Sequence, residues 1–380
     1  MRISPAGLLL GALILWIICV GPARTVHLIG APVPGPTDPF QIGYGMHIAV
    51  AEHMHLVRAA GFTHVKAYLS WANSEPEKGR YQWTYSQNTG DAYNIATNAQ
   101  RSGLKLIVRV DTPPDWAAAG SGNRPPDDLA DFADFMAALA RYLRGWVVAY
   151  EIYNEPNLSR EWGGQPPDPE LYAEMLKVVY PAIKSADPDA LVISAGMATT
   201  AGDGVTSMND LEFIRRMYQA GAMGYFDVLG SHPYAFGSAP QVEREDGIAG
   251  FFRPVEQRAV MLEFGDQSPI WATEFGWPID PAEFGGEEHL SHPAWSGLEW
   301  QVVSQSRQAE YARASYVYAR RNWPWMGVMV LFNLDFSTAP WYDEHEPMRY
   351  FSIVNADLSG RPAFTLLREM EKLYRPSQDR

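Results

Sequence analysis

Two glutamates stand at the ends of short apolar runs in this chain of 380 residues. Glu155 follows the run Trp146–Ile152, and Glu274 follows the run Pro269–Ala272. Such runs of apolar and β-branched residues predict buried strands that end where a loop begins. Two carboxylic acids in one cleft can cleave a glycosidic bond, because one protonates the leaving oxygen while the other attacks or stabilises the positively charged sugar.

The residues next to these acids favour this chemistry. The amide of Asn154 can hydrogen-bond a sugar hydroxyl that is bound most tightly in the transition state. Glu274 is followed by Phe275-Gly276-Trp277, where glycine permits a tight turn and the aromatic rings can shield the carboxylate. The alternatives are structural: Glu155 could be an exposed acid at a strand end, and Glu274 could pair with an arginine.

Aromatic side chains fall in the loops expected after strands. Flat indole rings can stack on the C–H faces of a pyranose, although large aromatic residues more often serve packing. The candidate sugar platforms are Trp71, Trp116, Trp277, Trp295 and Trp341. Asn333, at the end of the last expected strand, is a further candidate for substrate binding.

Strand-like and helix-like stretches alternate along the whole chain after its first residues. The expected strands are 41–46, 63–69, 104–110, 146–153, 191–196, 226–232, 270–274 and 327–333. Amphipathic helices are expected at 129–143, 169–185, 210–220, 255–264 and 305–320, where apolar residues recur every three or four positions. Eight strand–helix units predict the α/β class and a closed (β/α)8 TIM barrel.

The runner-up fold is an open doubly wound sheet. Its glycine-rich phosphate turn is missing after the first strand, since Gly43-Tyr44-Gly45 lies within that strand and lacks a third glycine. The longest connections follow strand ends, where barrel enzymes build their sites. We find no linker or shift of composition, so residues 24–380 are expected to form a single catalytic domain.

Composition excludes several classes of function. The formal net charge is −14, and no long run of Lys or Arg offers the basic footprint that nucleic-acid binding needs. The pair His289 and His292 lacks a convincing third ligand, so no metal is expected. No phosphate-binding loop and no serine nucleophile elbow is present. A carbohydrate substrate fits this chain better, with no cofactor and no obligate protein partner.

The first residues read as a targeting segment. Arg2 precedes an apolar run from Pro5 to Val20, which is short for a membrane-spanning helix and ends in small residues. Residues 1–23 are therefore expected to be a signal peptide of a secreted or extracytoplasmic protein, with an uncleaved anchor as the alternative. The only cysteine, Cys19, lies in this segment, so the remaining chain has no disulfide.

The order and surroundings of the two glutamates resemble the large clan of retaining glycosidases built on (β/α)8 barrels, clan A. Within it the chain is similar to family 5, the cellulase-like group, and family 39, the β-xylosidase-like group. Segments 70–83 and 351–357 resemble the clan's loop after strand two and its closing segment. The resemblance implies that Glu155 is the acid/base, Glu274 the nucleophile, and Asn154 the partner of the sugar hydroxyl beside the reacting carbon.

The resemblance also suggests supporting roles. The clan often places a histidine and a tyrosine near the nucleophile, and His232 and Tyr234 occupy the end of the sixth expected strand. Tyr234 could donate to Glu274, and His232 could hold a substrate hydroxyl or be a satisfied core histidine. One departure is Lys66, where many members carry an arginine. Arg109 could supply that charge instead, and the two cations are not interchangeable.

We therefore expect a retaining β-glycoside hydrolase that cleaves an oligo- or polysaccharide by double displacement. A transglycosylase sharing the same covalent intermediate is one alternative, and a carbohydrate-binding barrel without catalysis is another.

Overall fold

The computed structural model describes residues 38–85, 90–120, 122–242, 250–284 and 289–372. The expected signal peptide, residues 1–23, lies outside them. Within the described part of the chain, no helix is both long and apolar enough to cross a membrane.

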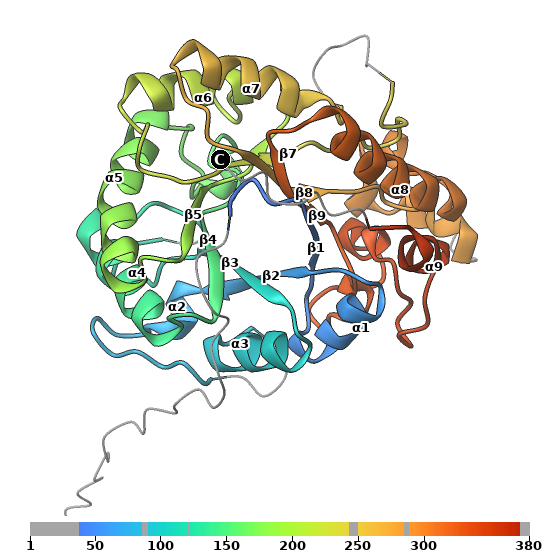
Figure 1. Ribbon diagram of the computed structural model, residues 1–380, viewed down its shortest axis with the longest axis horizontal. Helices are drawn as coiled ribbons and strands as arrows, with labels where there is room; N and C mark the ends of the chain where they lie inside the picture. The colour runs from blue at the N-terminus through green and yellow to red at the C-terminus, as the bar shows by residue number, and fades with distance from the viewer. Residues whose placement is uncertain (1–37, 86–89, 121, 243–249, 285–288, 373–380) are drawn as a thin grey trace, which may run out of the picture.

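Parallel strands form a ring at the centre of the molecule, and helices surround it (Figure 1). The strands are β1 (Gly43–His47), β2 (His64–Ser70), β3 (Lys105–Asp111), β4 (Val147–Ile152), β5 (Leu191–Ser194), β6 (Met197–Ala198), β7 (Leu229–His232), β8 (Ile270–Phe275) and β9 (Met326–Leu331). Their order in the sheet is β5-β4-β3-β2-β1-β9-β8-β7-β6.

The two ends of this order meet. Ile193 of β5 forms a parallel bridge with Val228, which directly precedes β7, and the Ser194 amide donates to the Val228 carbonyl at 3.0 Å. β5 and β6 therefore share one position, and the barrel has eight. This closure confirms the predicted (β/α)8 fold and excludes the open doubly wound sheet. Glu155 follows the fourth barrel strand, and Glu274 lies near the end of the seventh, β8.

The helices follow their strands in turn. They are α1 (Met54–Ala59), α2 (Trp71–Ser74), α3 (Ala92–Arg101), α4 (Leu129–Tyr142), α5 (Pro169–Ala186), α6 (Asp210–Gln219), α7 (Arg253–Glu263), α8 (Gln305–Asn322) and α9 (Pro362–Glu369). Asp91, Asp168 and Ser304 each accept a hydrogen bond from a backbone amide at the start of a helix, which satisfies an otherwise unpaired donor. The predicted helices agree with these bounds to within two residues.

The interior of the barrel has an apolar region filled by branched side chains and one indole. Its members are Ile107, Val148, Ala149, Leu191, Ile193, Val228, Trp271, Val328 and Val330. The Trp271 indole nitrogen donates to the Pro39 carbonyl at 2.8 Å, before the first strand begins. The amino-terminal half of the barrel is therefore a packed core, as in other barrels of this kind.

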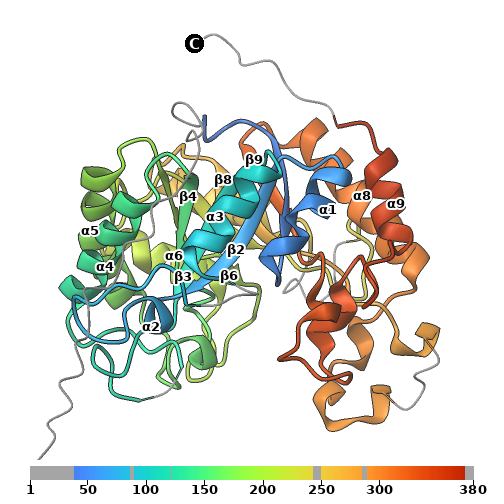
Figure 2. The ribbon, with the colours of Figure 1, turned by 90° about the horizontal axis from the view of Figure 1, so that it is seen from below.

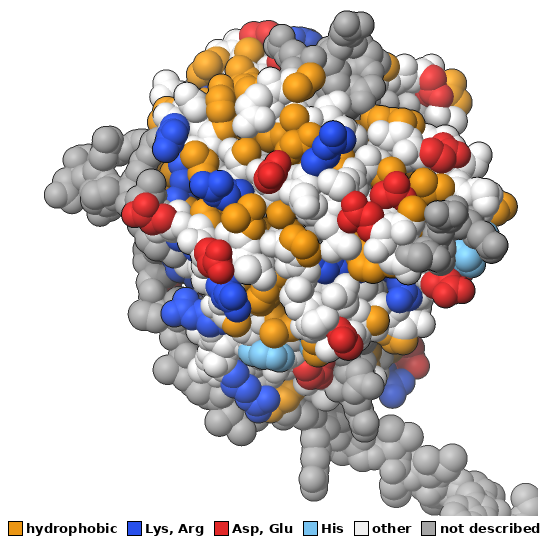
Figure 3. All heavy atoms as spheres, turned by 90° about the vertical axis from the view of Figure 1, so that its right-hand side faces the viewer, with side chains coloured by type: hydrophobic (Ala, Val, Ile, Leu, Met, Phe, Trp, Pro, Cys, Tyr) orange, Lys and Arg blue, Asp and Glu red, His pale blue; other side chains and the backbone are white. Residues whose placement is uncertain are grey.

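The described parts of the long connections after β8 and β9, residues 276–284, 289–304 and 335–357, lie on the same side of the barrel (Figure 2). They contain short 3-10 turns, among them Pro293–Trp295, Glu299–Gln301 and Pro347–Phe351. The face that carries α8 and α9 shows basic and acidic side chains interspersed with apolar ones (Figure 3). A functional site is expected on the loop side, where barrels bind ligands.

A buried ion pair joins α6 to α7. Asp210 is fully buried and accepts hydrogen bonds from Arg253 Nε at 3.0 Å and from Gln257 Nε2 at 2.8 Å. Asp210→Ala should lower the free energy of unfolding by about 3 kcal/mol or more, because Arg253 would keep a buried charge without its main partner. Urea unfolding measures this.

The matched control is Glu256→Ala. Glu256 pairs with the same Arg253, but its side chain is 53% exposed. An exposed pair contributes less than about 1 kcal/mol. Equal losses in the two variants would show that the burial of Asp210 has no energetic importance.

Candidate active site

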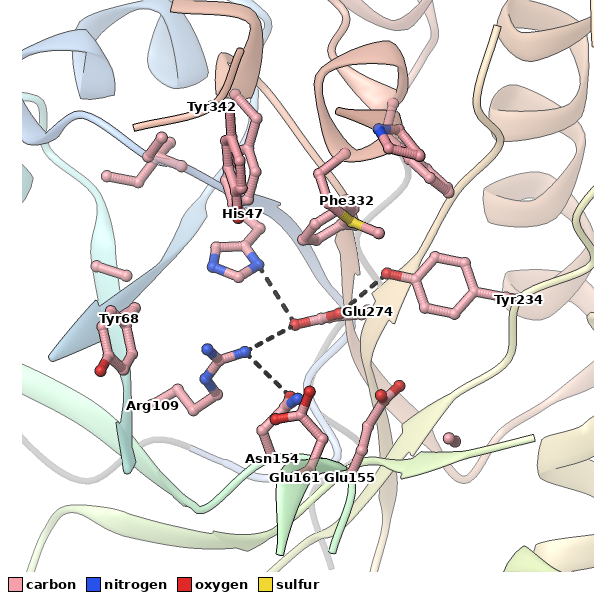
Figure 4. Close-up of a pocket in the computed structure, with 18 of the residues that line it drawn as sticks. His47, Tyr68, Arg109, Asn154, Glu155, Glu161, Tyr234, Glu274, Phe332 and Tyr342 are labelled. Atoms are coloured by element: carbon pink, nitrogen blue, oxygen red, sulfur yellow. Dashed lines mark hydrogen bonds and ion pairs between the residues drawn. The ribbon is translucent and has the colours of Figure 1, made fainter. Parts of the chain in front are cut away.

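A cavity of about 850 Å³ lies at the carboxyl ends of the barrel strands. Its wall includes His47, Arg109, Asn154, Glu155, Glu161, Tyr234, Glu274, Trp341 and Tyr342. Both predicted glutamates therefore face one space. Figure 4 shows His47, Arg109 and Tyr234 directed toward Glu274 from three sides.

Glu274 is contacted on both carboxylate oxygens. Oε1 lies 3.0 Å from Lys66 Nζ, 3.4 Å from Arg109 Nη1 and 3.4 Å from His47 Nδ1. Oε2 accepts a hydrogen bond from the Tyr234 hydroxyl at 2.9 Å. These contacts on both oxygens hold the carboxylate in one orientation.

Charge keeps Glu274 ionised. Burial by itself would raise the pKa of Glu274, but the positive charge of Lys66, followed by that of His232 and a hydrogen bond with His47, holds it well below its usual range. Burial, followed by the charge of Glu274, raises the pKa of Tyr234 well above its usual value. The phenol therefore remains neutral and donates a hydrogen bond to the Glu274 carboxylate.

Lys66 stands where many members of the clan that this chain resembles carry an arginine. Its side chain is fully buried. It reaches Glu274 from β2, while Arg109 reaches the same oxygen from β3. The arginine is also held by Asp111, with 3.1 Å between Arg109 Nε and Asp111 Oδ2. Both cations predicted to be near Glu274 thus lie there.

The backbone around Glu155 is unusual. Tyr153 and Glu155 have φ angles of 67° and 39°, in the left-handed region that residues other than glycine rarely adopt. The Glu155 amide donates to the carbonyl of Gly196 at 3.2 Å, which links this turn to the next barrel strand. Non-glycine residues in this region gather at functional sites when the surroundings hold them there.

His232 contacts Glu155 rather than the cavity. Its Nδ1 lies 2.9 Å from Glu155 Oε1, and its ring is fully buried. Burial would lower the pKa of His232, but Glu274, Glu151 and Glu155 together raise it to about 9. The expectation that His232 holds a substrate hydroxyl is corrected by this burial: the positively charged ring instead orients a carboxylate.

Space for this ring comes from a glycine. A Cβ atom at Gly196, between β5 and β6, would lie 2.2 Å from His232 Cδ2. No side chain fits there without moving the histidine.

Asn154 is oriented by a cation. Its Oδ1 accepts a hydrogen bond from Arg109 Nη1 at 3.0 Å. Glu161, in the turn Ser159–Glu161, lies beside it in the cavity wall (Figure 4). Burial, followed by repulsion from Glu155, raises the pKa of Glu161, and a hydrogen bond with Asn154 opposes the shift. A third carboxyl group is thus close to the two predicted ones.

Most of the predicted tryptophan platforms are placed elsewhere. Trp71, Trp277 and Trp295 are almost fully buried, and Trp71 Nε1 donates to Glu75 Oε2 at 2.7 Å. Trp116 Nε1 donates to the Glu75 carbonyl at 2.9 Å, and its ring packs against Trp71. These four indoles belong to the packing of the loops, so their assignment as sugar platforms is corrected.

Two further residues predicted to bind substrate, Trp341 and Asn333, differ in their exposure. Trp341 lines the cavity and is 52% exposed, so its ring is accessible, as the predicted platform requires. Asn333 is fully buried, and both ends of its amide are hydrogen-bonded within the protein. Its Oδ1 accepts from Ser352 Oγ at 2.8 Å, and its Nδ2 donates to the Met348 carbonyl at 3.0 Å. Asn333 therefore braces the closing loop and does not reach substrate.

Sequence reasoning missed His47 and Glu161. His47 ends β1, and a polar residue at the end of a barrel strand is the signal that could have found it. Burial lowers the pKa of His47 to about 4, so the ring is neutral at pH 7. Glu161 carries no such signal, since its position depends on the course of a loop. Among the described residues, no group of three or more potential metal ligands gathers.

Known structures share this architecture. A family 39 glycoside hydrolase from Bacteroides cellulosilyticus aligns with a TM-score of 0.64 at 20% identity, over 88% of this chain and 64% of that one. A family 39 β-xylosidase from Caulobacter crescentus gives 0.60 at 18%, over 88% and 72%. Xylanase 10B from Thermotoga maritima gives 0.56 at 16%, over 87% and 95%. The chain thus spans less than two thirds of the first of these proteins.

The barrel is the fold of the glycoside hydrolases that these structures represent. The sequence model of the cellulase family, glycosyl hydrolase family 5, matches residues 28–220, just over half of the chain. The chain belongs to this family. A search of curated protein sequences finds no significant match.

The two histidines next to the carboxylates should differ in charge. At pH 7.5 we expect the His232 ring to be protonated on both nitrogens and to lose a proton near pH 9, while His47 is neutral. Because the pKa of His232 is raised above the unfolded value of 6.5, its contacts stabilise the fold fully below that pH and are lost as pH rises through about 9.

Nitrogen-15 NMR of the imidazole rings measures both states, with His232→Gln and His47→Gln assigning the signals. A neutral His232 at pH 7.5 would contradict the assigned charges.

Proposed function

We propose that this glycoside hydrolase is a retaining β-glycosidase, with Glu274 as nucleophile and Glu155 as acid/base. One observation carries the proposal: His232 Nδ1 lies 2.9 Å from Glu155 Oε1 and 3.9 Å from Glu274 Oε2. The two oxygens are therefore less than about 7 Å apart. That upper limit includes the roughly 5–5.5 Å of retaining enzymes and excludes all but the lower end of the roughly 6.5–9.5 Å of inverting ones.

In the first step, Glu274 attacks the anomeric carbon while the bond from that carbon to the leaving oxygen breaks. Glu155 transfers its proton to this oxygen, and the sugar becomes an ester of Glu274. In the second step, Glu155 takes a proton from water, and the water oxygen attacks the anomeric carbon. Glu274 leaves as a carboxylate, and Glu155 is again protonated.

The surroundings suit these roles. The cations around Glu274 keep it ionised for attack, and Tyr234 fixes the second oxygen. His232 binds Oε1 of Glu155. We assign the transferred proton to Oε2, which lies 3.5 Å from Nη2 of the exposed Arg160. Asn154, held by Arg109, is placed in the same wall to bind the hydroxyl next to the reacting carbon.

Candidate substrates follow from the cavity and the similar structures. A volume of about 850 Å³ exceeds the room one sugar ring needs and suits an oligosaccharide. The aligned structures include a β-xylosidase, xylanases and a glucosidase. We therefore place β-xylosides and β-glucosides first among substrates to test.

Two other functions share this site. A transglycosylase would transfer the sugar from Glu274 to another sugar instead of water, and products larger than the substrate would reveal it. A binding barrel without catalysis would bind sugar and release no product. The ionised Glu274 and the strained turn at Glu155 favour catalysis over the second alternative.

Substitution of the two glutamates separates their roles. Glu274→Gln should abolish hydrolysis of all glycosides, because no ester can form. Glu155→Ala should retain the first step on aryl glycosides with good leaving groups, and azide should restore turnover by replacing the activated water. Rates are measured on aryl β-glycosides together with soluble glucans, xylans and mannans.

Asp210→Ala serves as the matched control, since it weakens the fold away from the cavity. If Glu274→Gln kept the wild-type rate on any substrate, the nucleophile assignment would be wrong. Sugar binding with no hydrolysis by the wild-type protein would favour the binding barrel.

We also propose export through residues 1–23. The apolar run after Arg2 and the small residues that follow it support a cleaved leader. Expression of the whole chain in a bacterial host should yield protein outside the cytoplasm with Arg24 at its amino terminus, as shown by amino-terminal sequencing. Recovery of the uncleaved chain in the membrane fraction would favour the anchor instead.

A further inference from the structure

Another glutamate, Glu151, lies inside the barrel and does not line the cavity. It belongs to β4, four residues before Glu155, and is fully buried. A buried carboxylate is costly unless it is paired, so its partners indicate what it does.

Glu151 contacts cations from two other strands. Its Oε2 lies 2.6 Å from Lys66 Nζ of β2, and its Oε1 lies 3.8 Å from His232 Nε2 of β7. Oε1 also accepts from the Gly196 amide at 3.3 Å. These three side chains come from barrel strands two, four and six, the alternate strands whose residues meet in one layer of a barrel interior.

The other ends of both cations contact the predicted catalytic acids. Lys66 Nζ is 3.0 Å from Glu274 Oε1, and His232 Nδ1 is 2.9 Å from Glu155 Oε1. Glu151 is thus connected to Glu274 through the Lys66 side chain and to Glu155 through the His232 side chain. Burial would raise the pKa of Glu151, but Lys66 and His232 lower it to about 2, which keeps it charged.

The charges balance in the free enzyme and change during the reaction. Three cations, Lys66, His232 and Arg109, are opposed there by three carboxylates, Glu151, Glu274 and Asp111. When Glu274 becomes a sugar ester it loses its charge. Glu151 is then the carboxylate still in contact with Lys66, so the buried cation keeps a counter-charge throughout the cycle.

We propose that Glu151 is a positioning residue that holds Lys66 against Glu274 and His232 against Glu155. This inference rests on the proposed roles of Glu155 and Glu274. Without Glu151, Lys66 directs its whole charge to Glu274, which weakens that carboxylate as a nucleophile. His232, which is faced by Glu151, Glu155 and Glu274, loses a negative charge that helps to hold its proton.

The test is Glu151→Gln, which keeps the size of the side chain and removes its charge. We expect kcat/KM for an aryl β-glycoside to fall at least about tenfold, through kcat rather than KM. The His232 proton should be lost about one pH unit lower than in the wild type, as measured by nitrogen-15 NMR. The alkaline limb of the pH–rate profile should move in the same direction.

Glu151→Asp and Ile193→Val are the controls. The aspartate restores the charge and should recover part of the rate and of the His232 midpoint. Ile193 lies in the apolar region of the barrel, so its truncation should lower stability and leave the midpoint unchanged. If Glu151→Gln does not fold, the double variant Lys66→Met/Glu151→Gln removes the whole pair and takes its place in the NMR measurement.

The proposal is overturned if the folded Glu151→Gln variant, or the double variant, has the same titration midpoint of His232 as the wild type. It is also overturned if the kcat/KM of Glu151→Gln lies within about twofold of the wild-type value. Failure of the proposed function gives a different result. If the wild-type protein hydrolysed no glycoside, the His232 midpoint would still report whether Glu151 holds this histidine charged.

Discussion

The structure depends on keeping a carboxylate ionised inside a protein. Glu274 is only 6% exposed, and taking an unpaired charge out of water costs several kcal/mol. Lys66 and Arg109 compensate this cost from β2 and β3, and Tyr234 adds a hydrogen bond from beyond β7. Each of these groups reaches Glu274 because a closed barrel directs the ends of all its strands toward one axis.

This requirement divides the barrel interior into two parts. Toward the amino-terminal ends of the strands, branched side chains and Trp271 form a dry core. Toward the carboxyl ends, Lys66, Glu151 and His232 form a layer of charges beneath the cavity. The packed part gives the strands a fixed geometry, and the charged part uses that geometry to place groups within hydrogen-bonding distance.

Residues that directly follow an apolar run at a strand end could be predicted from the sequence better than residues on loops, although His47, at the end of β1, was missed. Glu155 and Glu274 lie at strand ends, so the apolar runs that precede them were enough to predict that both face one cleft. Trp71 and Trp277 are also near strand ends, but their burial depends on contacts with distant parts of the chain, Phe135 of α4 and the Ser238 carbonyl, and such contacts leave no periodic pattern. The same limit concealed Glu161, whose place in the cavity wall follows from the course of a single turn.

Gly196 shows where the sheet and the active site compete for the same space. The fifth barrel strand is interrupted there, between β5 and β6, and the missing side chain makes room for the His232 ring. Regular strand pairing is thus interrupted at Gly196, where the His232 ring needs space to contact Glu155. Variation at this point of the fifth strand is therefore constrained by the chemistry of neighbouring strands rather than by the strand's own packing.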